Sequence, residues 1–171
     1  MKTKQIFLFV LICLTFGFCR PNQAQNSNAQ PSRFIEQPFG NQVYVYDTLR
    51  HVIQNKKNYI YEINENLPYD CKCGIEMIEP YYYKIVDEMF SAERKKELKE
   101  LTVLFIFYAD SLGNVLEVSF MAKKILLLTL QEVSALEKAF LQYKVRIIDP
   151  CPGKKYYLFT GTYWFSGKER T

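Results

Sequence analysis

The sequence has little of what most enzyme sites use. Its 171 residues include one histidine, His51, and one tryptophan. It contains no G-x-S-x-G nucleophile motif, no phosphate-binding loop, no EF-hand and no H-E-x-x-H motif. Acyl transfer needs a nucleophile, a base and an orienting group, so we expect a solitary His51 to be an ordinary loop residue. The sequence therefore favours a non-catalytic protein over an enzyme.

Long apolar runs are also scarce, and the one at the N-terminus is short. The cationic start Met1–Lys4 precedes residues 6–18, thirteen residues without a charge. A helix that spans a bilayer needs about 20 apolar residues, so this run is typical of a cleaved signal peptide, residues 1–24. We expect cleavage after Ala24, with lipid attachment at Cys19 as the alternative. Export to the cell envelope follows, with no membrane span in the mature chain.

An excess of one charge sign is missing too. The full chain carries 22 basic and 18 acidic residues, a net charge of +4. Residues 1–24 hold three of the basic residues and none of the acids, which leaves +1 for the mature chain. A near-neutral domain has no long-range field to concentrate nucleic acid, so we expect no nucleic-acid partner. The remaining basic clusters are expected to be solvated surface: Lys56-Lys57, Arg94-Lys95-Lys96, Lys123-Lys124 and Lys154-Lys155.

The polar start of the mature chain predicts a flexible lead-in. Residues 25–42 are rich in Asn, Gln, Ser and Pro and poor in apolar residues. The rest, residues 43–171, has the length of one domain. Residues 43–46 and 59–63 are rich in β-branched and aromatic residues, so we expect two strands with a turn at 55–58 between them.

Two later segments have the spacing of amphipathic helices. Pro80 is suited to a first helical turn, and apolar residues follow it at intervals of three and four. Ser91 is placed to cap a second helical piece through Glu100, so one bent helix and two helices fit equally. Thr129-Leu-Gln-Glu132 is a capping box that opens a helix to about Tyr143. The apolar stripe of the first segment consists of Tyr82, Ile85, Val86, Met89 and Phe90.

The C-terminal half carries the strongest strand signals. Residues 102–108 are apolar on both faces, which predicts a central strand. The turn Asp110-Ser-Leu-Gly-Asn114 places Gly113 where a positive φ costs little. Residues 115–122 then alternate, with Leu116, Val118 and Phe120 expected on one face, so a hairpin follows. Shorter signals predict a strand at 145–148, a turn at 150–153 and a last long strand at 156–165.

Three short motifs precede the capped helix, and a fourth, Tyr163-Trp-Phe165, follows it near the end of the chain. The three are Pro80-Tyr-Tyr82, Val103-Leu-Phe-Ile-Phe-Tyr-Ala-Asp110 and Gly113-Asn-Val-Leu-Glu-Val-Ser119. Over about residues 80–165 this order resembles the TonB C-terminal domain and the TonB-like secreted domains of Bacteroides and relatives. The resemblance implies an α+β fold, a small antiparallel sheet with helices packed on one face, as an αββαβ core with added N-terminal strands. It also implies a Gram-negative periplasm or cell surface. A protein partner would pair with the last strand, around Tyr157, Phe159 and Tyr163.

Two features of TonB itself are missing from the sequence. There is no persistent transmembrane anchor and no Pro-rich linker long enough to cross the periplasm. Transmission of force from an inner-membrane motor requires both an anchor and such a linker, so we do not expect this protein to transduce energy.

Three cysteines remain after residue 24: Cys71, Cys73 and Cys151. An exported protein meets an oxidising compartment, so a disulfide is the first expectation. A bond from Cys71 or Cys73 to Cys151 would close about 80 residues and stabilise the fold by roughly 4 kcal/mol, whereas a bond between Cys71 and Cys73 would be strained. Unpaired or intermolecular thiols, a redox C-x-C pair and a Cys₃His zinc site with His51 are the alternatives.

The leading functional hypothesis is a non-catalytic protein-binding module that acts through an exposed sheet edge, with no cofactor and no metal. The alternative is a small periplasmic enzyme, either a thiol oxidoreductase using the C-x-C cysteines or a carboxylate-dependent cell-wall hydrolase. An inhibitor or immunity-type protein is a third option, and the oligomeric state stays open. Neighbouring acids for the hydrolase are Glu62 with Glu65, Glu76 with Glu79, and Asp87 with Glu88.

Overall fold

The computed structural model describes residues 32–60, 74–78 and 81–167. These residues belong to one compact unit, Ser32–Thr171. The expected signal peptide, the lipidation alternative at Cys19, and the cysteines Cys71 and Cys73 lie outside the described residues.

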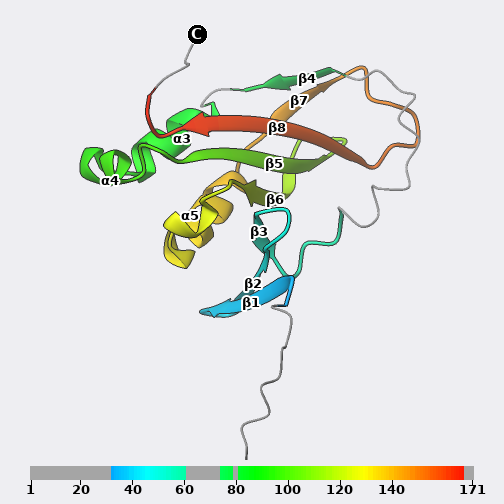
Figure 1. Ribbon diagram of the computed structural model, residues 1–171. Helices are drawn as coiled ribbons and strands as arrows, with labels where there is room; N and C mark the ends of the chain where they lie inside the picture. Colours follow the sequence, from blue (N-terminus) through cyan, green and yellow to red (C-terminus); the bar gives the residue numbers. More distant parts are fainter. Residues whose placement is uncertain (1–31, 61–73, 79–80, 168–171) are drawn as a thin grey trace, which may run out of the picture. The chain divides into compact units, whose positions relative to one another are not determined.

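In the described residues, antiparallel β-sheet is the main regular structure (Figure 1). Six strands form one sheet in the order β1-β2-β3-β6-β5-β8, and two more form a separate ribbon, β4-β7. The bounds are β1 Phe34–Phe39, β2 Gln42–Asp47, β3 Val52–Asn55, β4 Gly74–Met77, β5 Thr102–Asp110, β6 Val115–Met121, β7 Val145–Ile148 and β8 Tyr156–Trp164.

Among the described residues, three α-helices and a short 3₁₀ helix accompany the sheet: α3 Tyr82–Met89, α4 Ala92–Glu97, η1 Ile125–Leu127 and α5 Leu130–Phe140. The segment after Pro80 is therefore two helices rather than one bent helix. Phe90 is extended, with φ −113° and ψ 127°, and the Ser91 hydroxyl accepts the N–H of Arg94 at 3.2 Å to open α4. The predicted capping box of α5 is confirmed by both of its hydrogen bonds, between Thr129 and Glu132.

The predicted central hairpin is confirmed, and its turn shows why it needs glycine. The Asp110 carboxylate accepts the backbone N–H groups of Leu112 and Asn114, both at 2.9 Å. Gly113 has φ +80°, and a Cβ there would lie 1.8 Å from the carbonyl oxygen of Val145. Any side chain at position 113 would therefore push β7 away from the hairpin.

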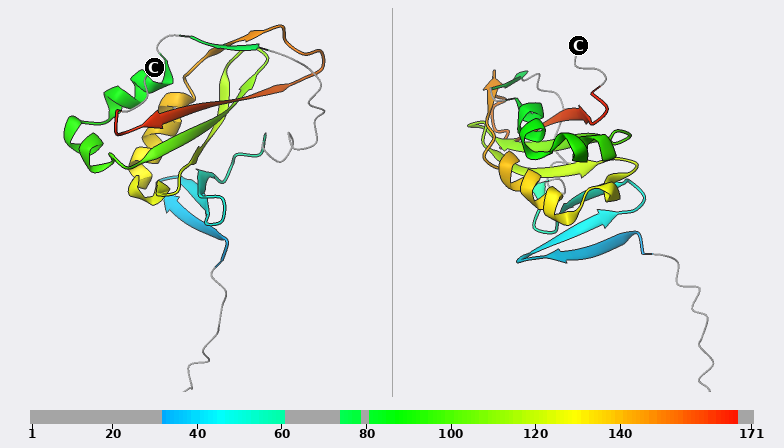
Figure 2. Two further views of the ribbon diagram at one scale, coloured as in Figure 1. Left: turned by 45° about the horizontal axis from the view of Figure 1, so that its top comes forward. Right: turned by 90° about the vertical axis from the view of Figure 1, so that its left-hand side faces the viewer.

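One face of the six-stranded sheet forms the core with the helices (Figure 2). Val103, Phe105 and Phe107 on β5 are 0% exposed. The Phe140 ring of α5 lies 4.9 Å from that of Phe105 and 5.2 Å from that of Phe107. The Tyr82 ring of α3 lies 6.0 Å from Phe105, so both helices cover the same face. The expected α+β fold is confirmed at this level, while the specific TonB arrangement is not.

The N-terminal strands differ from the sequence prediction. Residues 34–39, expected within a flexible lead-in, form β1 and pair with β2. The partner of β2 on its other side is Val52–Asn55, so the chain turns at 48–51 rather than first at 55–58. Five of the six β1 residues are exposed. A strand that buries so little has no apolar pattern by which the sequence could reveal it.

A β-bulge explains a second difference. The β5·β6 register shifts between Tyr108 and Ala109, which pair with Glu117 and Val115. Leu116, between these two partners, is therefore an extra residue that pairs with no residue of β5. Leu116 is 39% exposed, whereas Val118 and Phe120 are 0% exposed. The prediction that Leu116 shares their face was wrong, because Leu116 is itself the extra residue of the bulge.

Candidate functional site

The open face of the six-stranded sheet carries a cavity of about 510 Å³. Antiparallel pairing places Leu104 of β5 opposite Met121 of β6, which in turn lies opposite Val52 of β3. These side chains point away from the helix-covered face, since side chains alternate along each strand. The apolar and aromatic lining of the cavity comes from all six strands of the sheet: Phe34, Val45, Val52, Leu104, Ile106, Tyr108, Met121 and Leu158.

Two of the polar side chains within this lining bind each other. The Ser119 hydroxyl donates to the side-chain oxygen of Gln54 at 3.0 Å, and Ser119 is 5% exposed. Ser119 and Gln54 therefore satisfy each other, while Tyr108 and Thr160 contribute further hydroxyl groups to the lining.

One end of the cavity is charged. Arg33, Asp47 and Arg50 line it together. The Arg33 guanidinium donates to both carboxylate oxygens of Asp47, the shortest contact being 2.7 Å, and the backbone N–H groups of Leu49 and Arg50 donate to the same carboxylate. Hydrogen bonding from Arg33 lowers the pKa of Asp47 to about 2. Asp47 is therefore ionised at neutral pH and holds the β2–β3 turn in place.

The second feature is the outer side of β8, which pairs with β5 on its other side and ends the order of the strands that the structure describes. Along an antiparallel strand the backbone groups alternate between the two neighbours. The N–H of Phe165 donates to the carbonyl of Leu101, next to β5, whereas the carbonyl of Thr162 accepts the Tyr82 hydroxyl at 2.9 Å. The even-numbered residues of β8 thus direct their backbone groups away from β5, and these include Leu158 and Thr160.

The three residues that the resemblance implied for partner binding turn their side chains inward. Tyr157, Phe159 and Tyr163 are 1%, 8% and 2% exposed. The Phe159 ring stacks on that of Phe107 at 4.7 Å, and the Tyr163 hydroxyl donates to Asp87 at 2.6 Å. They shape the core behind β8. A partner on this edge would meet backbone groups, with Leu158 and Thr160 as the nearest outward positions.

Of the three cysteines in the disulfide hypothesis, the structure describes only Cys151. Cys151 is 6% exposed and directly precedes the turn into β8. Its expected partners, Cys71 and Cys73, lie outside the described residues, so the disulfide stays a prediction.

Of the residues predicted for a histidine or carboxylate site, the structure describes His51, Glu76, Asp87 and Glu88. His51 lies in the β2–β3 turn, with its Nδ1 3.1 Å from the Tyr46 hydroxyl. Asp87 accepts from Lys95 and Tyr163, and Glu76 forms an ion pair with Arg146 at 2.9 Å. Glu62, Glu65 and Glu79 lie outside the described residues. Within the described part of the chain, no three His, Cys, Asp or Glu side chains cluster to hold a metal ion.

Two buried acids were not anticipated. Glu137 of α5 is 4% exposed and accepts the Tyr44 hydroxyl at 2.6 Å. Glu117 of β6 is 6% exposed and accepts the backbone N–H groups of Tyr59 and Ile60. Burial raises the pKa of Glu117. Each acid joins distant segments through hydrogen bonds, a structural use that no local sequence pattern could reveal.

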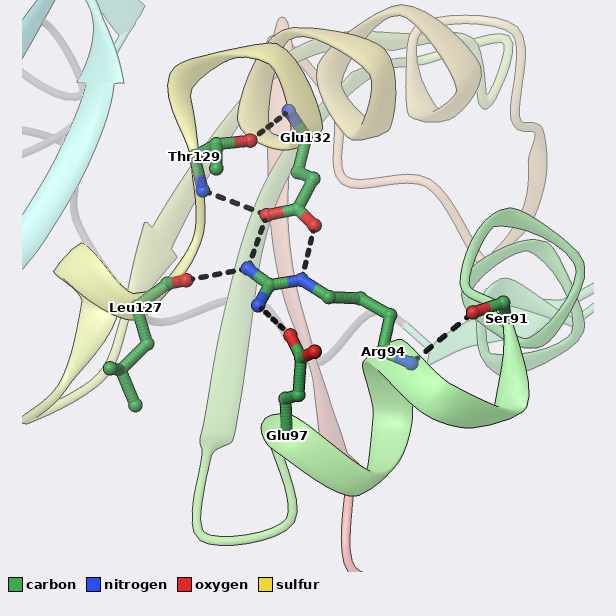
Figure 3. A network of polar contacts seen from close by, with 6 residues as sticks. All are labelled: Ser91, Arg94, Glu97, Leu127, Thr129 and Glu132. Atoms are coloured by element: carbon green, nitrogen blue, oxygen red, sulfur yellow. Dashed lines mark hydrogen bonds and ion pairs between the residues drawn. The ribbon is translucent and has the colours of Figure 1, made fainter.

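The polar network around Arg94 is also structural (Figure 3). Its guanidinium donates to both carboxylate oxygens of Glu132, at 2.7 and 3.0 Å, to Glu97 at 2.7 Å and to the carbonyl of Leu127 at 2.8 Å. The same Glu132 carboxylate accepts the N–H of Thr129 in the capping box. These bonds fasten α4 to the start of α5 and use most of the guanidinium donors, which leaves little to bind a ligand.

None of the helices in the described ranges is both long and apolar enough to cross a membrane.

No protein-family model and no curated protein match the sequence. Among solved structures, a crystal structure of a DUF5043 family protein from Bacteroides uniformis is similar, with a TM-score of 0.63 over 80% of this chain and 88% of that one. The two sequences are 15% identical over the match, so the likeness concerns the fold. It supports the resemblance to a Bacteroides-type family and leaves the TonB C-terminal arrangement unconfirmed.

Proposed function

We propose that this chain is a non-catalytic binding module that captures an extended, uncharged segment of a protein partner along β8. The proposal places the module in the cell envelope, after export directed by residues 1–24. The observation that carries it is the register of β8. Its even-numbered backbone groups point away from β5 along a nine-residue strand at the end of the sheet.

The composition of β8 supports this role. Sheet edges are usually protected from pairing with other chains by charged residues, prolines or bulges. β8, Tyr156–Trp164, contains no charged residue and no proline. The opposite edge, β1, carries Glu36 and Pro38. This difference in composition supports β8, rather than β1, as the edge that accepts a strand.

The exposed side chains of β8 indicate the chemistry of the partner. Leu158 is 41% exposed and Thr160 is exposed as well. An added strand would gain backbone hydrogen bonds from both residues and place its own side chains beside them, as in other strand-addition complexes. An uncharged segment rich in β-branched and aliphatic residues fits these neighbours, because it desolvates no charge.

The test compares Thr160→Pro with Thr160→Val. Proline removes the outward N–H of residue 160, whereas valine keeps this N–H and the β-branched shape. Peptides would be selected from a random display library on the purified chain, and the exchange rates of the Leu158 and Thr160 amides measured with and without the selected peptide. We expect slower exchange at both amides, and Thr160→Pro should weaken binding by at least about tenfold, the loss of one or two hydrogen bonds.

The control variant Thr160→Val should bind within about twofold of the original chain, since its backbone donor is intact. Binding that survives Thr160→Pro, or protection confined to other strands, would contradict the proposal. If the chain instead self-associates and Thr160→Pro abolishes that association, the edge receives a second copy of this chain and the peptide partner is excluded.

A further inference from the structure

The outer side of β8 is not open along its whole length. We infer that Tyr82 of α3 closes the C-terminal part of this edge, so that a captured strand can pair only with residues 156–160. This role of Tyr82 rests on the proposed strand capture and deepens it, because it sets the length of the partner segment and the position at which pairing must stop.

The hydroxyl of Tyr82 occupies a backbone acceptor that a partner strand would otherwise use. Tyr82 is the first residue of α3, which lies beside the C-terminal end of β8 (Figure 1). Its hydroxyl donates to the carbonyl of Thr162 at 2.9 Å. Thr162 is one of the residues whose backbone groups point away from β5, and an added strand bonds to every second residue of the edge that it joins. Tyr82 therefore takes the place of a partner N–H at Thr162.

Gly161 allows the Tyr82 ring to reach this carbonyl. A Cβ at position 161 would lie 2.7 Å from Cζ of Tyr82, so a side chain there would push the ring away. Phe105, which pairs with Gly161, has its ring 6.0 Å from that of Tyr82. The ring is thus held over the strand, and burial raises the pKa of the Tyr82 hydroxyl. The hydroxyl therefore stays protonated, and able to donate, well above neutral pH.

A second contact uses the next outward carbonyl of β8. The N–H of Gly167 donates to the carbonyl of Trp164 at 3.1 Å. By contrast, none of the described residues forms a hydrogen bond with the outward backbone groups of Leu158 or Thr160. The edge is thus divided into an occupied C-terminal part and a part that can accept a strand, residues 156–160. A partner segment of about five residues, roughly 17 Å long, covers the second part.

The length of a partner segment should therefore matter only until it covers residues 156–160. Further residues of the segment would meet the Tyr82 hydroxyl and would have to displace it to form a bond of their own. Such an exchange leaves the number of hydrogen bonds unchanged and gains little affinity. Removal of the hydroxyl should make the Thr162 carbonyl available to a longer segment.

The test uses Tyr82→Phe, which removes the hydroxyl and keeps the ring. A peptide selected on the purified full chain is prepared in a short form of about five residues and in a form lengthened at both ends. The short form should bind the original chain and Tyr82→Phe within about twofold. The long form should bind Tyr82→Phe about threefold to tenfold more tightly than the original chain, the gain of one hydrogen bond. It should slow amide exchange at Leu158 and Thr160 in both chains, and at Thr162 in Tyr82→Phe alone.

Tyr143→Phe is the matched control. The Tyr143 hydroxyl also donates to a backbone carbonyl, that of Ile78 at 3.0 Å, which does not belong to β8. Its removal costs the protein the same kind of hydrogen bond without changing the edge. Tyr143→Phe should therefore bind both peptide forms within about twofold of the original chain.

Protection of the Thr162 amide by the long form in the original chain would overturn this role of Tyr82. Equal binding of the long form to the original chain, Tyr82→Phe and Tyr143→Phe would overturn it as well. Both results leave strand capture intact, since the short form would still protect Leu158 and Thr160. If neither form protects these two amides, strand capture itself fails, and the role of Tyr82 fails with it.

Discussion

The two faces of β5 have similar amino acids and different surroundings. Val103, Phe105 and Phe107 point into the helix-covered core and are 0% exposed. Leu104 and Ile106 point to the other face, are partly exposed and line a cavity. A strand that is apolar on both faces normally indicates cover on both. Here α3 and α5 cover one face, and the described residues leave a cavity on the other.

The largest expected effect on stability comes from a substitution on the covered face. Phe105→Ala should lower the free energy of unfolding by about 3–5 kcal/mol, because it leaves a cavity among Phe107, Phe120 and Phe140. Ile106→Ala, one residue along the strand, should cost only about 1 kcal/mol, because its surroundings are already open. Urea unfolding of both variants checks the difference, and equal losses would show that the two faces are packed alike.

The next effect concerns two tyrosines on the covered face of β2. Tyr44→Phe removes the hydroxyl that donates to buried Glu137, so we expect a loss of about 1.5–3 kcal/mol. Tyr46→Phe removes a hydroxyl that contacts His51 on the half-buried turn, and should cost about 1 kcal/mol or less. Thermal unfolding of the two variants at pH 7 provides the measurement. If Tyr46→Phe lowers the stability more than Tyr44→Phe does, the buried Glu137 carboxylate does not depend on the hydrogen bond from Tyr44.

The charged end of the open face predicts a dependence on pH. The pKa of Asp47 is about 2 in the folded chain, below its ordinary value of 3.8. The ionised form is thus favoured by folding, and its contribution is complete above pH 3.8 and is lost as the pH falls through 2. Asp47→Asn should cost roughly 1–2 kcal/mol at pH 7, because the half-exposed Arg33 partner is screened by water.

Unfolding curves of Asp47→Asn and the original chain should therefore converge between pH 4 and pH 2. The control is Lys124→Ala, which removes an exposed ion pair with Glu100 and should change stability by less than about 1 kcal/mol. A gap between Asp47→Asn and the original chain that persists undiminished at pH 2 would show that the Arg33 pairing is not its cause.

The sequence anticipated the elements whose signal is local. The β5–β6 hairpin, its turn at Gly113 and the capping box at Thr129 were all predicted, because strong apolar patterns and side-chain caps depend on residues close in the chain. β1 was not predicted, since it is exposed along most of its length. β3, at Val52–Asn55, was not predicted either. Of the strand expected at 59–63, the structure describes only Tyr59 and Ile60, whose N–H groups donate to Glu117.

The β8 edge and the cavity differ in how much of each could be predicted from the sequence. An edge at the last strand was expected from the TonB-like order, but only the register shows that Leu158 and Thr160, rather than Tyr157 and Phe159, face outward. The cavity could not be predicted at all. Its residues come from separate strands and the N-terminal lead-in, and each one alone is an ordinary apolar or charged residue.

By itself, the sequence determined the α+β class, the central hairpin, the capped helix and the single histidine that leaves little room for acid–base chemistry. These follow from local patterns and composition, which do not depend on how distant segments meet. The tertiary structure alone decided which face of the sheet the helices cover, which edge lacks charge and proline, and where Arg33 meets Asp47. Those are consequences of pairing between distant strands, and pairing sets the surroundings of every side chain on a sheet.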